Sequence, residues 1–165
     1  MATIKQRITN CLWFDSEAEE AAALYTSIFK KSSTGAITRY GKEGFEFHKK
    51  PEGAVMTITF NLDGQEFLGL NGGPQFKFNE AMSLIINCEN QAEIDHYWYK
   101  LTEGGQEGPC GWLTDKFGVS WQVVAVGWIE MLNSPDKEKV KRVTEALFNM
   151  KKPVIEILEK AFNGQ

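Results

Sequence analysis

Two histidines are the side chains of this chain best suited to move a proton near neutral pH. His48 lies in the polar segment FEFHKKPEG, and His96 lies between Asp95 and Tyr97 in a helical pattern. We interpret His96 as an ordinary surface residue. His48 is either a solvated loop residue or a base on a loop that folds over a binding site. The sequence shows no Ser-His-Asp order and no Cys-His pairing that would indicate an activated nucleophile.

Three cysteines are present, an odd number without a C-x-x-C pair. Cys11 and Cys88 fall in strand patterns, and Cys110 lies in a loop between Pro109 and Gly111. Neither a disulfide framework nor a zinc site is indicated, and a reducing cytosol is the expected setting. Buried packing explains all three cysteines, and Cys110 is the one candidate for a reactive thiol.

The pattern of elements that would position these side chains occurs twice. Residues 8–25 read ITNCLWFDSEAEEAAALY and residues 82–99 read MSLIINCENQAEIDHYWY, and a shift of 74 positions aligns them. Each copy is typical of an apolar strand, a helix N-cap (Ser16 or Asn90) with a glutamate three residues later, and a helix. A repeat this long indicates two paired modules rather than a solenoid.

Strand and turn patterns complete each module in the order β-α-β-β-β. The modules span about residues 5–71 and 80–128, and a linker at 71–79 contains glycine and proline. Asp63–Gly64 is a strong hairpin turn. The expected strands are residues 8–14, 37–40, 54–62, 65–70, 83–88, 112–114 and 119–126.

Two segments lie outside these strands and helices. The polar segment 41–53 is expected to be a loop or a mobile hairpin. A helical extension is expected at 131–165, with Ser134 and Pro135 as cap and first-turn residues and a break at Pro153.

Composition excludes several classes of function. The chain is 42% apolar and 24% charged, as globular domains are. The net charge is −4 and no basic run exceeds two residues, so nucleic-acid binding is not expected. No apolar run suits a membrane span and the first residues do not form a secretory signal, so a cytoplasmic location is expected.

Three segments together carry a family likeness: ITNCLWFDSEAEEAAALYTSIF, VMTITFNLDGQEFLGLNGG, and INCENQAEIDHYWYKLTEGG followed by CGWLTDKFGVSWQVV. They resemble the PhnB-like branch of the vicinal oxygen chelate superfamily, which is the glyoxalase, bleomycin-resistance and extradiol-dioxygenase fold. The resemblance covers nearly the whole chain, including the tail at 140–162. Members of this branch are often labelled 3-demethylubiquinone-9 3-methyltransferase-like. A common S-adenosylmethionine site needs a glycine-rich loop after a first strand, and the glycines here fall in hairpin turns and the linker instead.

The resemblance implies an α+β fold in which paired β-α-β-β-β modules form a cup-shaped eight-stranded mixed sheet. This single glyoxalase-like domain would cover residues 1–130, with the C-terminal helices at 131–165. It also implies that a homodimer is common. In the metal enzymes of the superfamily, four inward-facing strand positions supply His and Glu ligands to a divalent ion, which activates two neighbouring substrate oxygens.

Those four positions correspond here to Thr9 or Asn10, Leu68, Ser83 and Gln122. Hydroxyl, amide and alkyl groups are poor ligands for zinc, nickel or iron, and a magnesium or calcium site would need carboxylates. No metal cofactor is therefore expected.

The same strands predict a metal-free pocket by alternation of their side chains. An apolar and aromatic wall with a few neutral hydrogen-bonding groups suits a small organic ligand, whereas plain core packing is the alternative for each residue. Trp112 is either a lid over the pocket or a core residue, and Trp121, out of phase with Gln122, is expected in the core. The pocket candidates are Thr9, Cys11, Trp13, Leu68, Ser83, Ile85, Trp112 and Gln122.

Three hypotheses for function follow. The first is a metal-independent binding protein for a small molecule. The second is an enzyme (a lyase, an isomerase or a dioxygenase) that uses a relocated metal, or no metal and His48 or Cys110. The third is an interaction module whose dimer surface matters most. The expected partners are a small molecule and a second copy of the chain, not nucleic acid or a membrane.

Overall fold

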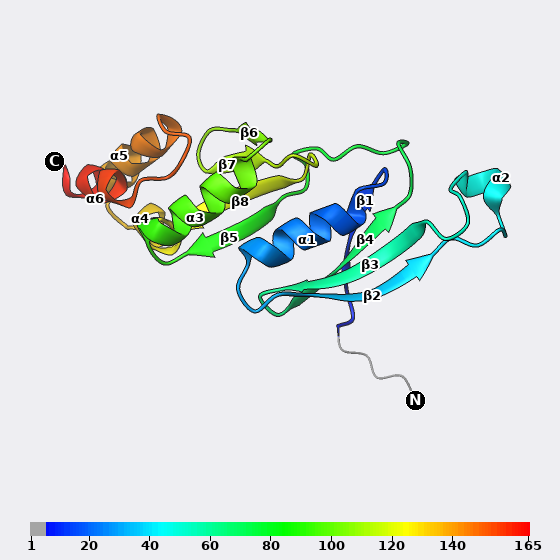
Figure 1. The fold of residues 1–165 in the computed structure, drawn as a ribbon. Helices are drawn as coiled ribbons and strands as arrows, with labels where there is room; N and C mark the ends of the chain where they lie inside the picture. Colours follow the sequence, from blue (N-terminus) through cyan, green and yellow to red (C-terminus); the bar gives the residue numbers. More distant parts are fainter. Residues whose placement is uncertain (1–5) are drawn as a thin grey trace. The chain divides into compact units, whose positions relative to one another are not determined.

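The computed structural model describes residues 6–165, which divide into two compact units between Lys77 and Phe78. Each unit has a four-stranded mixed sheet with a helix on one face, so the fold is α+β as predicted (Figure 1). The strand order is β1-β4-β3-β2 in the N-terminal unit and β5-β8-β7-β6 in the C-terminal unit. Because the two orders are equivalent, the repeat in the sequence is a repeat of topology. The eight strands form two four-stranded sheets.

In the N-terminal unit, β1 runs parallel to β4 and the other neighbouring strands are antiparallel. β1 is shorter than predicted because Ile8 and Thr9 precede the ladder, which starts with Asn10 opposite Phe67. The elements are β1 (Asn10–Phe14), α1 (Ala18–Ile28), β2 (Ser33–Arg39), α2 (Phe45–His48), β3 (Val55–Leu62) and β4 (Gln65–Asn71).

Two predictions for residues 33–53 are wrong. β2 begins at Ser33 rather than at residue 37, because Ser33 already pairs with Asn61 across an irregular register. The segment expected to be a loop contains the short helix α2. Left-handed residues, Gly44 (φ 78°) and Lys49 (φ 55°), bound this helix at both ends.

Helix α1 packs closely on β3 and β4 and forms the core of this unit. Its buried face is Ala18, Ala21, Ala22, Tyr25 and Ile28, at the spacing of one side of a helix. A Cβ added at Gly69 of β4 would lie 3.1 Å from the Cβ of Ala18, so small residues on both elements allow the close approach.

The start of α1 differs from the prediction. Ser16 is not the N-cap; that position is Glu17, whose side chain makes no cap hydrogen bond. The backbone N–H of Ala18 instead donates to Oδ1 of Asn71, at 2.9 Å. A buried side chain at the end of β4 thus satisfies the helix start, through a contact that no local sequence pattern reveals.

The hairpin between β3 and β4 has the predicted turn. Asp63 (φ 46°) and Gly64 (φ 92°) both lie in the left-handed region, as a two-residue hairpin of this hand requires. The turn sets the register in which Thr59 faces Leu68 and Thr57 faces Leu70.

In the C-terminal unit, β5 runs parallel to β8 and the β6-β7-β8 neighbours are antiparallel. β6 and α4 are not among the predicted elements. β6 has two residues, and α4 continues the apolar run of β8 without a side-chain cap, so neither has a local pattern that marks it. The elements are β5 (Leu84–Cys88), α3 (Gln91–Thr102), β6 (Gln106–Glu107), β7 (Trp112–Thr114), β8 (Ser120–Ala125), α4 (Val126–Leu132), α5 (Lys137–Phe148) and α6 (Ile155–Asn163).

Helix α3 begins with the predicted cap and lies on the sheet of the C-terminal unit (Figure 1). Oδ1 of Asn90 accepts from the N–H of Glu93 at 3.0 Å, and the Glu93 carboxylate accepts from the N–H of Glu89 at 2.9 Å. The buried face of the helix is Ile94, Trp98 and Leu101, whereas Tyr97 is half-buried.

The turn between β7 and β8 is built on Asp115, which is 3% exposed. One carboxylate oxygen accepts from the backbone N–H groups of Phe117 and Val119, and the other accepts from Nε1 of Trp121 at 2.9 Å. Trp121 is therefore in the core, as predicted, and is fixed there by the turn that precedes its strand.

The C-terminal helices α5 and α6 pack on each other, and Pro153 separates them as predicted. The N-cap of α5 is Asp136 rather than Ser134, because the Asp136 side chain accepts from the N–H groups of Glu138 and Lys139. Within the described chain, no helix is long and apolar enough to cross a membrane.

Candidate functional site

Four of the predicted pocket residues meet on the face of the C-terminal sheet opposite α3. Ile85 of β5 is the ladder partner of Gln122 in β8, and Gln122 is the partner of Trp112 in β7. Cross-strand partners project from the same face, so these three side chains form one row across the sheet, here called the Gln122 row. Ser83, just before β5, joins the row through a hydrogen bond from Gln122 Nε2 to Ser83 Oγ, at 2.8 Å.

The Gln122 row offers neutral polar atoms beside apolar surface. Ile85 is 57% exposed, and Ser83, Trp112 and Gln122 are half-buried. Within residues 6–165, the Gln122 side chain makes one hydrogen bond, to Ser83. The indole N–H of Trp112 makes no hydrogen bond in this part of the chain. Gln122 Oε1, the Ser83 hydroxyl hydrogen and the Trp112 N–H therefore remain for a bound molecule.

A cavity of about 360 Å³ adjoins this row along the β6–β7 edge. Trp112 and Thr114 line it from the sheet. Of these two, Trp112 alone is a predicted pocket candidate. The remaining lining residues are not predicted, because β6 is absent from the predicted elements and the rest lie in loops and in the core. They are Glu80, Gln106, Glu107, Gly108, Pro109 and Leu113.

In the N-terminal unit, three predicted residues share the face of the sheet opposite α1. Cys11 is the ladder partner of Leu68, and Trp13 follows on the same side of β1, opposite Leu70. Thr9 is exposed and lies before β1, at the position that Ser83 occupies before β5. Like the Gln122 row, the part of this face formed by Cys11, Trp13 and Leu68 carries no charged side chain.

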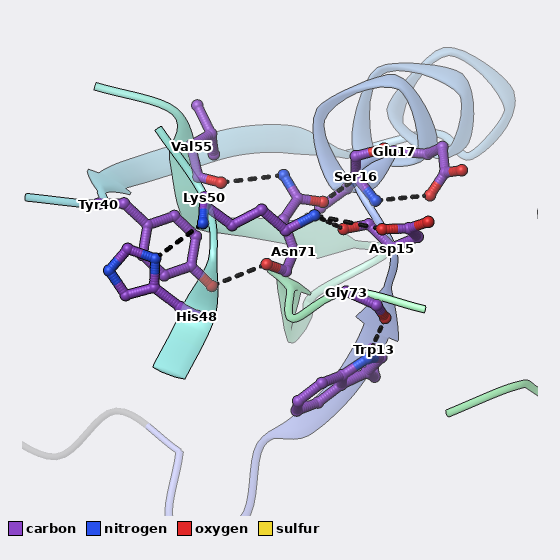
Figure 2. A network of polar contacts seen from close by, with 11 residues as sticks. Trp13, Asp15, Ser16, Glu17, Tyr40, His48, Lys50, Val55, Asn71 and Gly73 are labelled. Carbon is purple, nitrogen blue, oxygen red and sulfur yellow. Dashed lines mark hydrogen bonds and ion pairs between the residues drawn. The ribbon is translucent and has the colours of Figure 1, made fainter. Parts of the chain in front are cut away.

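Trp13 is held in place by the segment that follows β4. Its Nε1 donates to the carbonyl oxygen of Gly73 at 2.8 Å (Figure 2). Its ring meets Phe76 edge-on, with the ring centroids 4.9 Å apart. A Cβ on Gly72 would come within 2.2 Å of the indole, so only glycine fits there. Trp13 has thus used its polar atom, unlike Trp112.

His48 occupies a fixed position on the segment between β2 and β3 (Figure 2). The backbone N–H of Lys50 donates to its Nδ1 at 3.0 Å, and its Nε2 lies 3.2 Å from the carbonyl oxygen of Glu43. Since an N–H only donates and a carbonyl oxygen only accepts, this geometry selects the tautomer protonated at Nε2. The imidazole also stacks on Tyr40. Both ring nitrogens are occupied, which does not favour a role as general base.

Lys50 connects the same segment to the end of β1. Its Nζ donates to the carbonyl oxygen of Asp15 at 2.7 Å and to the Asp15 carboxylate at 3.2 Å (Figure 2). The Tyr40 hydroxyl donates to the carbonyl oxygen of Asn71, whose amide also donates to Val55. The network positions the segment and leaves no titratable group poised for chemistry in it.

The fold family implies a divalent ion, and the four corresponding positions do not fit one. Ser83 and Gln122 bond to each other, Leu68 is an alkyl side chain, and Thr9 is exposed. Glu66 is a carboxylate on the same face as Leu68, but the polar cavity of about 370 Å³ that it lines contains no second acidic or imidazole side chain. Within residues 6–165, no three His, Cys, Asp or Glu side chains lie close enough to hold a metal ion.

The three cysteines are free thiols with different surroundings. Burial, with a smaller effect of the Glu93 carboxylate, raises the pKa of Cys88 to about 12. Partial burial also raises the pKa of Cys110 and the pKa of Cys11. None of the three is an activated thiolate at neutral pH, because a raised pKa keeps the thiol protonated.

Thiol labelling should therefore follow exposure. At pH 8 we expect the exposed Cys11 to react first, the half-buried Cys110 more slowly, and the buried Cys88 only after urea unfolds the chain. Peptide mapping after timed iodoacetamide labelling measures all three rates. Each rate should rise with pH, since thiolate accumulates toward the raised pKa. Rapid labelling of Cys110 at pH 6 would show instead that Cys110 is activated.

Comparison with known proteins places the chain in a family. The sequence model of the 3-demethylubiquinone-9 3-methyltransferase family matches residues 6–124. The PhnB protein of Bacillus cereus is 39% identical, with a TM-score of 0.64, over 73% of this chain and 100% of that one. The chain belongs to this family. The predicted resemblance to PhnB-like proteins is thereby confirmed.

Two more distant structures share the fold of this family member. Protein PA1353 of Pseudomonas aeruginosa is 20% identical, with a TM-score of 0.58, over 73% of this chain and 98% of its own. The fosfomycin resistance protein FosX of Listeria monocytogenes is 14% identical, with a TM-score of 0.51, over 80% of this chain and 100% of its own. At these identities the likeness concerns the fold alone. No curated protein matches the chain.

The family name refers to methyl transfer, for which S-adenosylmethionine would be the expected methyl donor. In this family member, β1 is followed by Asp15, Ser16 and Glu17, without a glycine. Asp15 is engaged by Lys50, and the N–H of Ser16 donates to the Glu17 carboxylate. The segment after β1 therefore does not fit the glycine-rich loop of a common methyltransferase.

Proposed function

We propose that this PhnB-like protein binds a small, mainly apolar organic molecule without a metal ion. The observation that carries the proposal is the Gln122 row, with Trp112 at its end in the wall of a cavity of about 360 Å³. Ligand sites typically have volumes of about 300–1,000 Å³, apolar walls and a few convergent polar groups. The row combines an aliphatic side chain, an indole and a hydroxyl–amide pair in one such place.

Trp112 is the residue from which binding should draw most of its free energy. Its indole belongs both to the row and to the cavity, and its N–H makes no hydrogen bond within residues 6–165. An aromatic ligand packed on this ring would gain from burial and from ring contact, and a ligand acceptor would satisfy the N–H.

A neutral fluorescent probe tests this proposal. Phenylnaphthylamine should bind saturably, and Trp112→Ala should raise its Kd at least about tenfold, which corresponds to about 1.4 kcal/mol. Trp112→Phe should have a smaller effect because it retains most of the ring surface. The control is Phe47→Ala, which removes an aromatic side chain that is 81% exposed in α2.

Either of two results would overturn the proposal. One is probe binding without saturation in the wild-type protein, as expected for nonspecific adsorption. The other is equal weakening by Trp112→Ala and Phe47→Ala, which would place the probe on exposed apolar surface in general. Circular dichroism spectra of both variants check that they are folded.

We also propose that the protein forms a homodimer. Several apolar side chains of the C-terminal unit are exposed, and contiguous exposed apolar surface often marks an interface. They include Val126, Ile129, Phe148 and Ile157. No observation favours the enzyme hypothesis to a similar degree, since His48 has both nitrogens engaged and the Cys110 thiol is not activated.

A further inference from the structure

The hydroxyl–amide pair of Ser83 and Gln122 offers one hydrogen-bond acceptor and one donor to a ligand. We propose that the Gln122 row selects an uncharged aromatic molecule that carries a group able both to donate and to accept a hydrogen bond, such as a carboxamide or an alcohol. This inference rests on the proposed function and specifies its ligand.

The polar contact would close a ring of hydrogen bonds. Gln122 Nε2 donates to Ser83 Oγ at 2.8 Å, so Gln122 Oε1 remains an acceptor and the Ser83 hydroxyl remains a donor. A ligand carboxamide or alcohol can donate to Oε1 and accept from Oγ–H at once. The same ligand group also fits if the Gln122 amide is flipped, because the Ser83 hydroxyl can donate to Oε1 as well as accept from Nε2. The ligand would then accept from Gln122 Nε2 and donate to Ser83 Oγ.

The aromatic body of the ligand has a place beside this contact. Gln122 lies between Ile85 and Trp112 in the sheet, so a group held by Gln122 brings its substituent over one of two apolar side chains. The cavity lies on the Trp112 side. A planar ligand that extends from Gln122 over Trp112 would therefore enter the cavity.

Charge around the row argues against an anion. Among residues 6–165, the charged side chains that line the cavity are Glu80 and Glu107, and no lysine or arginine lines it. A carboxylate ligand would face these two glutamates and would lose its hydration on an apolar wall, without a cation to replace it.

A cation would gain little here. Glu107 already accepts from Trp98 Nε1 at 3.0 Å and lies 3.7 Å from Lys151 Nζ. Glu80 is exposed, so water screens its attraction for an ammonium group. The neutral amide and hydroxyl of Gln122 and Ser83 then match a neutral ligand best.

Four probes that share the naphthalene ring test the inference by calorimetric or fluorescence titration: naphthalene, naphthamide, naphthoate and naphthylmethylammonium. Naphthamide should bind about tenfold more tightly than naphthalene, the effect of one or two net hydrogen bonds. Naphthoate should bind at least about tenfold more weakly than naphthamide, and naphthylmethylammonium should also bind more weakly than naphthamide.

Variants locate the effect at the pair. In Gln122→Leu and in Ser83→Ala, the advantage of naphthamide over naphthalene should fall to less than about threefold, while naphthalene still binds. Gln165→Leu, the same kind of change at an exposed position, should leave the advantage at its wild-type value.

The outcomes separate the two proposals. If all four probes fail to bind, the proposed function fails and the inference with it. If naphthalene and naphthamide bind with equal Kd values and Trp112→Ala weakens both, the proposed function stands and the inference is overturned. Tighter binding of naphthoate or naphthylmethylammonium than of naphthamide also overturns it, as does an unchanged naphthamide advantage in Gln122→Leu.

Discussion

Replacing Asp115 by alanine is expected to lower the free energy of unfolding by about 3–5 kcal/mol. The Asp115 carboxylate is buried and accepts from three donors: two backbone N–H groups at 2.9 and 3.0 Å and the Trp121 indole N–H at 2.9 Å. Each buried donor left without a partner costs about 1–3 kcal/mol. The turn that positions β8, and therefore Gln122, depends on this carboxylate.

Asp115→Asn is the matched control for this prediction. It keeps an acceptor for the two backbone donors but brings an amide N–H₂ toward the indole N–H, so about half the loss is expected. Urea unfolding followed by tryptophan fluorescence measures both variants at pH 7. A loss below 1 kcal/mol for Asp115→Ala, which would be an ordinary surface effect, would contradict the role assigned to the turn.

Replacing Asn71 by alanine is expected to cost about 2–4 kcal/mol. The Asn71 side chain is 4% exposed; it accepts from the N–H of Ala18 at 2.9 Å and donates to the carbonyl oxygen of Val55 at 3.1 Å. It joins the start of α1 to β3 and β4, and its loss leaves two buried backbone groups unsatisfied. Hydrogen exchange should show the first turn of α1 opening more often than in the wild-type protein.

Asn90→Ala provides the comparison within the same chain. Asn90 caps α3 by a local bond to Glu93, and its position is exposed, so about 1 kcal/mol is expected for its loss. Urea unfolding of the two alanine variants gives the difference directly. Equal costs for Asn71 and Asn90 would mean that Asn71 acts as an ordinary cap rather than as a buried junction.

These two asparagines also show how far the fold could be predicted from sequence. The cap at Asn90 was predicted because its donor, Glu93, lies three residues away and the pattern is local. The predicted cap at Ser16 is wrong because the acceptor that replaces it, Asn71, lies 53 residues from its donor, Ala18, in sequence. β6 and α4 were missed because the first has two residues and the second continues an apolar strand without a turn residue.

The candidate site could be predicted in part for the same reason. Alternation along β5 and β8 placed Ser83, Ile85 and Gln122 together, and the β7–β8 register brings Trp112 to them. Glu80, Gln106 and Pro109 line the adjoining cavity, and they come from loops and an unpredicted strand whose positions depend on tertiary packing. The tautomer of His48 depends on backbone groups of Glu43 and Lys50, which no residue pattern specifies.

Native mass spectrometry of the protein with naphthamide, before and after treatment with a chelator, tests metal-independent binding most directly. The proposed function predicts one bound naphthamide per chain, an unchanged bound fraction after chelation, and no stoichiometric divalent ion. The same spectrum reports whether the chain is a dimer. A bound fraction that disappears on chelation and returns with added divalent metal would contradict the account, because the residues at the Gln122 row would then not be the ones that hold the ligand.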